Sequence, residues 1–127
     1  MKELTKAEEQ VMHILWKLEQ AFVKEIVAEM PEPKPAYNTV STIVRILENK
    51  GFVEHEAFGK THRYYPLISK ERYTQFFLKR VVNDYFENSF QEMVSFFSQD
   101  KSISVTDLEE IMDMIQKQIR EKRQSNG

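Results

Sequence analysis

The first half of the chain has three stretches in which apolar residues recur every three or four positions, the spacing of one helix face. The first stretch begins at Thr5, which forms a capping box with Glu8 and predicts a helix start there. The apolar residues of this helix are Ala7, Val11, Ile14, Leu15 and Leu18. After a break over residues 20–23, a shorter helix is predicted over residues 24–30. It buries Ile26, Val27 and Met30 and is ended by Pro31.

A third helix is predicted over residues 38–50, after a proline-rich segment. Asn38 is a favourable N-cap residue, and Gly51 suits the left-handed position that follows a helix. The inward face of this helix consists of Val40, Ile43, Val44 and Leu47.

The hydrophobic period then changes from that of a helix to that of a strand. Residues 52–57 predict a strand, residues 58–60 a turn, and residues 61–65 a return strand that Pro66 ends. Three short helices followed by a β-hairpin are the order of a winged helix-turn-helix. We therefore predict a mainly α fold with a winged helix-turn-helix domain over residues 1–68.

From Ser69 onward the pattern is helical throughout, and eight of the fifteen aromatic residues lie between positions 73 and 97. A break over residues 99–104 precedes a last helix, for which Thr106 and Glu109 form a second capping box. Residues 69–127 are therefore predicted to form a separate helical domain.

This C-terminal segment is too short to build its own core, yet it is rich in large apolar side chains. Leaving several of them in water would expose a larger apolar patch than monomers tolerate. A second copy of the same helices would cover them in a twofold-symmetric homodimer, and a different protein is the alternative cover. The predicted dimerisation residues are Phe76, Phe77, Tyr85, Phe86, Phe90, Phe97, Leu108, Ile111, Met112 and Ile115.

The outward face of the third predicted helix suits the major groove of DNA. Its short polar side chains allow a close approach to base edges and phosphates, and Arg45 can reach a guanine edge or a phosphate. The alternative is an ordinary solvated helix face, which is usually rich in Glu and Lys. The candidate DNA-binding residues on this helix are Asn38, Thr39, Ser41, Thr42, Arg45 and Asn49.

The predicted hairpin tip adds Lys60, His62 and Arg63 beside Gly59. A basic tip can lie along the phosphate backbone or enter the minor groove. The alternative is a hairpin whose charges only keep it soluble. The two features support each other because they follow in the order of a winged helix-turn-helix.

The overall charge does not favour DNA binding, because 18 basic residues face 20 acidic ones. Dividing the chain after Ile68 leaves 9 basic and 10 acidic residues in each part. Any DNA-binding surface must therefore be a local patch. The near-neutral charge keeps open a second hypothesis, a winged-helix protein-interaction module without DNA binding.

The remaining chemistry points away from an enzyme or a metal protein. The chain has no cysteine, and His13, His55 and His62 are scattered without a ligand cluster. Neither a phosphate-binding glycine loop nor a nucleophile elbow is present. We expect no cofactor and no catalytic residue. Neither a signal peptide nor a membrane span is evident, so we expect a cytoplasmic protein that does not bind membranes directly.

Four segments of the chain resemble one family of regulators over nearly its whole length. These segments are Ala7 to Trp16, Tyr37 to Thr42, Leu47 to Phe52, and Gly59 to Pro66 with its paired tyrosines. The family is that of the penicillinase and methicillin-resistance repressors (the BlaI/MecI group). The resemblance implies a dimeric repressor with an N-terminal DNA-binding domain, a C-terminal helical dimerisation domain and an operator with dyad symmetry. It also implies DNA contacts by Thr39 and Thr42.

The resemblance further implies a partner, since in well-known relatives a membrane sensor protease cleaves the repressor between an asparagine and a phenylalanine. The matching position here is Phe96-Phe97, where the asparagine is missing, so the cleavage site is not carried over. Copper-responsive relatives use cysteines near the C-terminus, and their absence here excludes that form of copper sensing.

Overall fold

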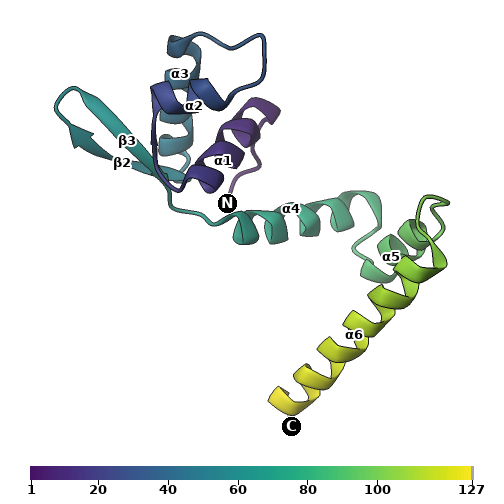
Figure 1. The fold of residues 1–127 in the computed structure, drawn as a ribbon. Coiled ribbons are helices and arrows are strands. Elements are labelled where there is room, and N and C mark those ends of the chain that lie inside the picture. Colours follow the sequence, from purple (N-terminus) through teal and green to yellow (C-terminus); the bar gives the residue numbers. More distant parts are fainter. Residues whose placement is uncertain (127) are drawn as a thin grey trace. The chain divides into compact units, whose positions relative to one another are not determined.

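The computed structural model describes residues 1–126 and divides the chain into two compact units (Figure 1). Unit 1 covers Met1–Lys79, and unit 2 begins at Arg80. Unit 1 contains α1 (Lys6–Leu18), β1 (Ala21–Phe22), α2 (Val23–Glu29), α3 (Tyr37–Asn49), β2 (Val53–Phe58) and β3 (Thr61–Pro66). Helix α4 (Lys70–Tyr85) begins in unit 1, and α5 (Phe90–Ser98) and α6 (Val105–Asn126) belong to unit 2.

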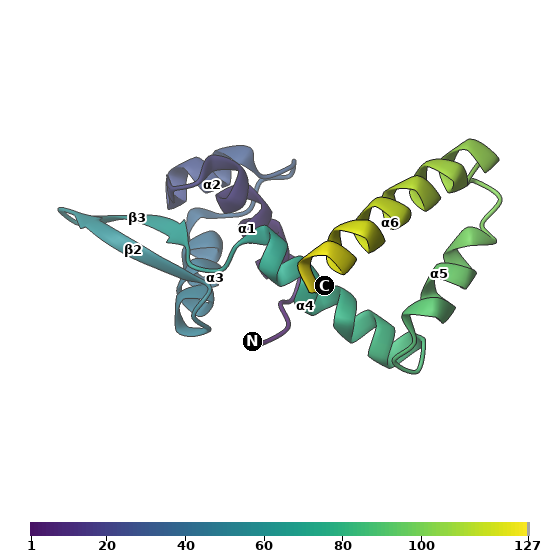
Figure 2. The ribbon, with the colours of Figure 1, turned by 90° about the horizontal axis from the view of Figure 1, so that it is seen from below.

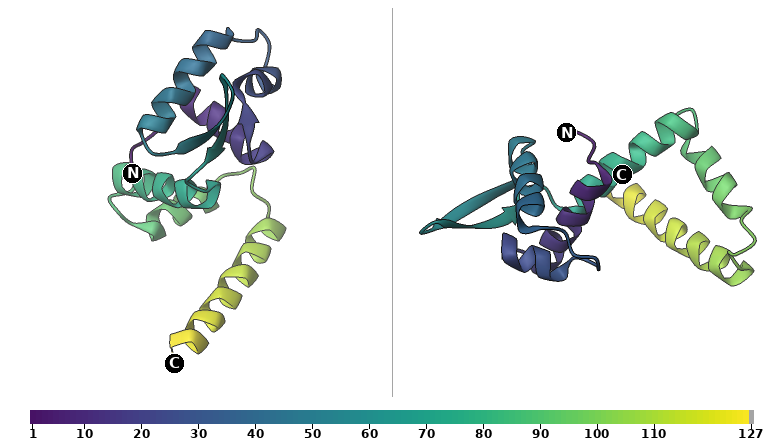
Figure 3. Two further views of the ribbon diagram at one scale, coloured as in Figure 1. Left: turned by 90° about the vertical axis from the view of Figure 1, so that its left-hand side faces the viewer. Right: turned by 90° about the horizontal axis from the view of Figure 1, so that it is seen from above.

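Unit 1 is a winged helix-turn-helix, as the sequence predicts. Strands β2 and β3 form an antiparallel hairpin, which we call the wing, in register from Val53 opposite Pro66 to Phe58 opposite Thr61. Figures 2 and 3 show the wing projecting from the three helices that precede it. The strand order is β1-β3-β2. Strand β1 was not predicted, because two residues are too few to show an alternating pattern.

The predicted start of α1 is confirmed, and the predicted start of α2 is wrong by one residue. The Thr5–Glu8 capping box is present at the start of α1. Helix α2 begins one residue earlier than predicted, at Val23, because the Glu25 carboxylate accepts a hydrogen bond from the Phe22 backbone N–H at 2.9 Å. Gly51 has a φ of 83°, which confirms the left-handed residue after α3.

Two other predicted caps are wrong. Helix α3 begins at Tyr37, and its N-cap is Ala36 rather than Asn38. The Ala36 carbonyl already accepts the backbone N–H groups of Thr39 and Val40, which leaves Asn38 inside the first turn. Helix α6 is capped by Ser104, whose hydroxyl accepts from the Asp107 backbone N–H, so the predicted pair of Thr106 and Glu109 lies within the helix.

The core of unit 1 brings the three helices and the sheet together. Its fully buried side chains come from every one of these elements: Val11, Met12, Leu15, Ala21, Ile26, Val40, Val44, Leu47, Phe52 and Val53. Ile43 and Val27, predicted to be buried, pack against this core but remain partly exposed.

The core also includes Tyr73 from the second turn of α4, with Phe76 packed against it. The compact unit therefore continues past Ile68, where we expected the N-terminal domain to end. The separate roles assigned to residues 1–68 and 69–127 stay a prediction. Among residues 1–126, none of the helices combines the length and apolar character that a membrane crossing requires.

Candidate nucleic-acid interface

The outward face of α3 is open to solvent along its length. Asn38, Thr39, Thr42, Arg45 and Asn49 are all exposed, and Ser41 is partly exposed. The large side chains of Tyr37 and Ile46 are exposed on the same helix. A helix surface that the other elements of unit 1 leave exposed is the first requirement for entry into a DNA groove.

Thr42 and Arg45 are linked along this face. The Thr42 hydroxyl donates to the Asn38 carbonyl oxygen at 2.9 Å, one turn earlier. Arg45 Nη2 lies 3.4 Å from the same hydroxyl oxygen, a long contact with a neutral partner. Within residues 1–126 no ion pair involves Arg45, so its guanidinium retains donors for a phosphate or a base edge.

A groove of about 630 Å³ runs between α3, the wing and the start of α2. We call it the α3–wing groove. Its lining carries three cations, Lys24, Arg45 and Lys60, and one carboxylate, that of Glu25, which is held by the Phe22 backbone N–H. The groove is therefore locally basic although the whole chain carries a net charge of -2.

The lining also includes residues that the sequence analysis missed. Lys24 was missed because it precedes the third predicted helix, and only the packing of α2 beside β3 brings it to the groove. Tyr37 was missed because the helix was expected to begin one residue later. Ser41, Arg45, Lys60 and His62 were predicted and do line the groove.

The inner face of the wing is tied to α3 through His55. The His55 ring Nδ1 hydrogen-bonds the Glu48 carboxylate of α3, and the ring stacks on His62 with centroids 4.0 Å apart. Beside them, Tyr64 is buried. Burial raises the pKa of its hydroxyl, and the charge of Glu48 raises it further. His62 thus packs against the rings of His55 and Tyr64 and also lines the α3–wing groove.

Arg63 lies on the opposite face of the wing. In the hairpin register it pairs with Glu56, whereas His62 pairs with Ala57, and successive residues of a strand point to opposite faces. Its guanidinium lies 3.3 Å from the Glu56 carboxylate and 4.6 Å from the centre of the Phe58 ring. The three predicted wing residues are therefore not on one surface, and Arg63 does not line the α3–wing groove.

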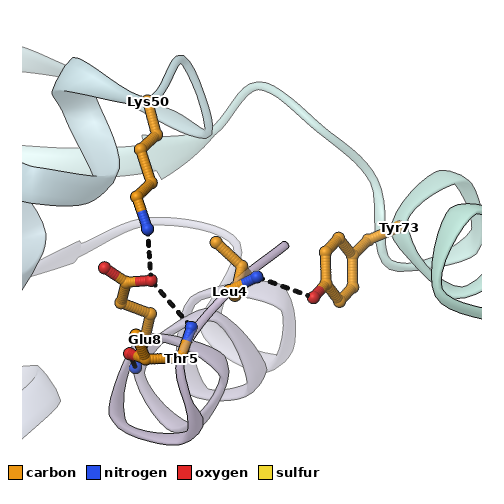
Figure 4. A network of polar contacts seen from close by, with 5 residues as sticks. All are labelled: Leu4, Thr5, Glu8, Lys50 and Tyr73. Atoms are coloured by element: carbon orange, nitrogen blue, oxygen red, sulfur yellow. Dashed lines mark hydrogen bonds and ion pairs between the residues drawn. The ribbon is translucent and has the colours of Figure 1, made fainter. Parts of the chain in front are cut away.

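A polar network behind the interface fixes the end of α3 (Figure 4). Lys50, the residue that ends α3, donates to the Glu8 carboxylate at 2.7 Å, and the same oxygen accepts from the Thr5 backbone N–H. Burial alone would raise the pKa of Glu8, but these hydrogen bonds and the Lys50 charge outweigh it and hold the pKa below its ordinary value. The capping box of α1 is in this way also an anchor for α3.

A second pair of contacts holds the segment between β3 and α4. The Tyr73 hydroxyl accepts a hydrogen bond from the Leu4 backbone N–H at 3.1 Å. The Trp16 indole N–H donates to the Ile68 carbonyl at 2.8 Å. Both contacts join the start of the chain to residues more than 50 positions away, so the first turns of α4 are part of the winged-helix unit.

The predicted dimerisation residues fall into two groups. Phe76 and Phe77 lie in unit 1, where both rings are next to Tyr73. The others lie in unit 2, where neither α5 nor α6 buries any residue. Tyr85, Phe90, Phe97, Met112 and Ile115 are exposed, and Phe86, Leu108 and Ile111 are partly exposed. A groove of about 300 Å³ on α6 is lined by Ile111, Met114, Ile115 and Ile119 with two polar neighbours.

Among residues 1–126, no three His, Cys, Asp or Glu side chains are grouped in a way that could hold a metal ion.

The chain is similar to known proteins in a family model, in sequence and among solved structures. The family model described as penicillinase repressor matches residues 4–117. The methicillin resistance regulatory protein MecI of Staphylococcus aureus (strain N315) is 26% identical over 116 residues, which are 91% of this chain and 94% of that protein. The penicillinase repressor of Bacillus licheniformis is 21% identical over 123 residues, 96% of each chain. Among solved structures, the solution structure of the DNA-binding domain of the repressor BlaI is 27% identical, with a TM-score of 0.49, and covers 57% of this chain and 94% of that chain.

Proposed function

The chain belongs to the penicillinase repressor family of DNA-binding transcriptional repressors, and we propose that it acts as a homodimer on an operator with dyad symmetry. The observation that carries the proposal is the exposed polar face of α3 beside the locally basic α3–wing groove. We propose that it acts in the cytoplasm, which stays an expectation from the sequence.

In this proposal α3 enters the major groove. Asn38, Thr39, Ser41 and Thr42 are short enough to let the helix approach the bases, and Arg45 reads a guanine edge or fixes a phosphate. Asn49 lies at the far end of the helix and contacts the backbone. Lys60 and His62 bring the wing to the neighbouring phosphates, and Lys24, which sequence reasoning missed, adds a cation from α2.

Dimerisation is proposed to rest on unit 2. Large apolar side chains on α5 and α6 stay exposed in a single chain, including Phe90, Phe97, Met112 and Ile115. Each buried aromatic removes about 150–250 Å² from water, so a second copy of these helices would gain several such areas. A twofold arrangement presents two α3 helices to successive major grooves, which is why the operator is expected to have dyad symmetry.

A gel-shift titration tests the proposal directly. The probe is the DNA immediately upstream of the chain's own coding sequence, with a scrambled duplex as competitor. Arg45→Ala is expected to weaken specific binding by about 1–3 kcal/mol if Arg45 makes a base contact. Arg72→Ala, an exposed arginine outside the groove lining, is the matched control and should bind like the wild type. Unchanged affinity and sequence preference for Arg45→Ala would defeat the assignment of Arg45.

The alternative function is a winged-helix protein-interaction module, which the net charge of -2 favours. The same titration separates the two functions, because a module of that kind would shift neither the upstream DNA nor the scrambled duplex. The relatives are named as repressors and regulators, so an enzyme is not proposed.

A membrane sensor protease stays a predicted partner. Phe96 and Phe97 lie near the end of α5, and their side chains are 71% and 59% exposed. The position is therefore accessible in the single chain, but a phenylalanine stands where the relatives' cleaved asparagine would be. We do not extend their cleavage site to this chain.

A further inference from the structure

Three side chains of the sheet form a continuous stack, and one of them, Phe22, also lines the α3–wing groove. The Phe22 and Phe58 rings meet edge to face with centroids 5.8 Å apart. The Arg63 guanidinium lies over the Phe58 ring, 4.6 Å from its centre. Phe22 comes from β1, where it pairs with Arg63, and Phe58 is the last residue of β2. The stack therefore joins all three strands.

Arg63 is already engaged within the protein. Its Nη2 is paired with the Glu56 carboxylate at 3.3 Å, and its Nε is buried without a hydrogen-bond partner. Only 29% of the side chain is exposed. Arg45 and Lys60 differ from Arg63 in that both line the α3–wing groove. The surroundings of Arg63 are those of a side chain that packs.

The wing tip depends on such packing because little else supports it. Strand β1 pairs with β3 only at Arg63 and Tyr64, so β3 has no neighbour on that edge beyond Arg63. An isolated two-stranded hairpin is marginally stable in water. The tip itself is closed by Gly59, with a φ of 63°, and by the Thr61 hydroxyl, which donates to the Phe58 carbonyl. The stack connects this tip to the body of unit 1.

We propose that Arg63 is a positioning residue of the DNA interface, which acts through the Phe22–Phe58–Arg63 stack to hold Lys60 beside the α3–wing groove. It does not itself touch a phosphate. The inference rests on the proposed function, and it replaces the expectation from the sequence that Arg63 grips the DNA backbone. Its role is to keep the cation at the tip in place before DNA arrives, which lowers the ordering cost of binding.

The test uses the full chain and the same upstream DNA over a range of salt concentrations. Arg63→Lys keeps the charge but loses the planar guanidinium that packs on the ring. Phe58→Leu keeps Arg63 and removes the ring. Each is expected to weaken specific binding about two- to fivefold, the size of an exposed cation–π contact, with the salt dependence unchanged. Lys60→Ala should instead lower the salt slope by about one, as loss of a phosphate contact does.

The double variant Arg63→Lys/Lys60→Ala gives the sharpest outcome. If Arg63 acts through Lys60, the substitution at Arg63 adds little once Lys60 is gone. The proposal would be overturned if Arg63→Lys bound DNA like the wild type. It would also be overturned if Arg63→Ala lowered the salt slope by about one and its loss of affinity added fully to that of Lys60→Ala. Lys2→Ala, at an exposed lysine outside the groove lining, controls for the loss of one charge.

Amide hydrogen exchange on the DNA-free protein separates this proposal from the proposed function. Arg63→Lys and Phe58→Leu should both speed exchange at residues 58–62 and leave α1 unchanged, because the stack supports only the wing. Exchange that is unchanged at the wing would overturn the role of the stack. If the wild type itself binds no DNA while the exchange result holds, the stack is real and the DNA function is wrong. Trp16 fluorescence verifies that each variant is folded.

Discussion

The two units of this chain differ in how far they bury their apolar side chains. Unit 1 closes around a core to which three helices, the sheet and the start of α4 all contribute. Helices α5 and α6 of unit 2 bury no residue, and their exposed side chains include Phe90, Phe96 and Met114. The difference indicates that unit 1 is complete as a single copy, whereas unit 2 has a surface that water does not favour.

Polar contacts follow the same division. In unit 1, Glu8 meets Lys50 across 42 positions of the sequence, and Leu4 meets Tyr73 across 69. In unit 2, the side chains of Ser89, Asp100 and Ser104 accept hydrogen bonds from residues only two or three positions away. Long-range polar contacts fix the relation of distant elements, whereas local ones cap helices or shape single loops. Unit 1 thus specifies its tertiary arrangement from within.

The largest effect is expected from the core of unit 1. Phe52→Ala removes a fully buried ring and should lower the free energy of unfolding by about 3–5 kcal/mol. Urea denaturation followed by the fluorescence of Trp16, the chain's one tryptophan, measures it within unit 1. Ile115→Ser on α6 is the contrasting variant. It should leave the Trp16 transition nearly unchanged and weaken the proposed dimerisation by at least about tenfold in analytical ultracentrifugation. If Phe52→Ala instead weakened association and Ile115→Ser shifted the Trp16 transition, the contrast between the two units would be wrong.

The sequence predicts those structural features of unit 1 that depend on residues close together in the chain. The strands predicted over 52–57 and 61–65 are found within one residue, at 53–58 and 61–66. The helical spacing of Val40, Val44 and Leu47 and the left-handed Gly51 are found as predicted. Strand β1 and the cap at Ala36 were missed. The first depends on pairing with β3 some 40 positions later, and the second on backbone hydrogen bonds that no side chain signals.

The candidate site divides in the same way. The exposed residues of α3 could be predicted, because the inward face of a helix fixes its outward face. The contribution of Lys24 could not, because it depends on how α2 packs beside β3. The position of Arg63 on the outer face follows from strand alternation, but its contact with Phe58 depends on the register of the hairpin.

The next effect in size concerns the polar anchor of α3. Glu8→Gln removes the charge that pairs with Lys50, and we expect a loss of about 1.5–3 kcal/mol at neutral pH, the range for hydrogen bonds to charged groups. The exposed pair of Lys17 and Glu29 supplies the control, since Glu29→Gln should cost no more than about 1 kcal/mol.

The same substitution has a pH dependence with a definite sign. The folded-state pKa of Glu8 lies below its ordinary value, because the hydrogen bonds from Lys50 and Thr5 outweigh the effect of burial. Its contribution is therefore fully present above the unfolded-state pKa and is lost as the pH falls through the folded-state pKa. The difference in unfolding free energy between wild type and Glu8→Gln should shrink on acidification through this window. A difference that stayed constant, or grew, would show that the Glu8 charge does not stabilise the fold.

The smallest effect tests where unit 1 ends. Tyr73→Phe removes the hydroxyl that accepts the buried Leu4 N–H and keeps the ring that packs beside Trp16, so we expect a loss of about 0.5–1.5 kcal/mol. The Trp16 transition in urea should report it, because the indole N–H donates to the Ile68 carbonyl in the segment that leads into α4. Tyr85→Phe alters the 78%-exposed tyrosine at the other end of the same helix and should leave that transition unchanged. If the two variants behaved alike, the start of α4 would not be part of the winged-helix core. A loss confined to Tyr73→Phe would place the end of unit 1 within α4 instead of before it, as the hydrogen bond between Leu4 and Tyr73 predicts.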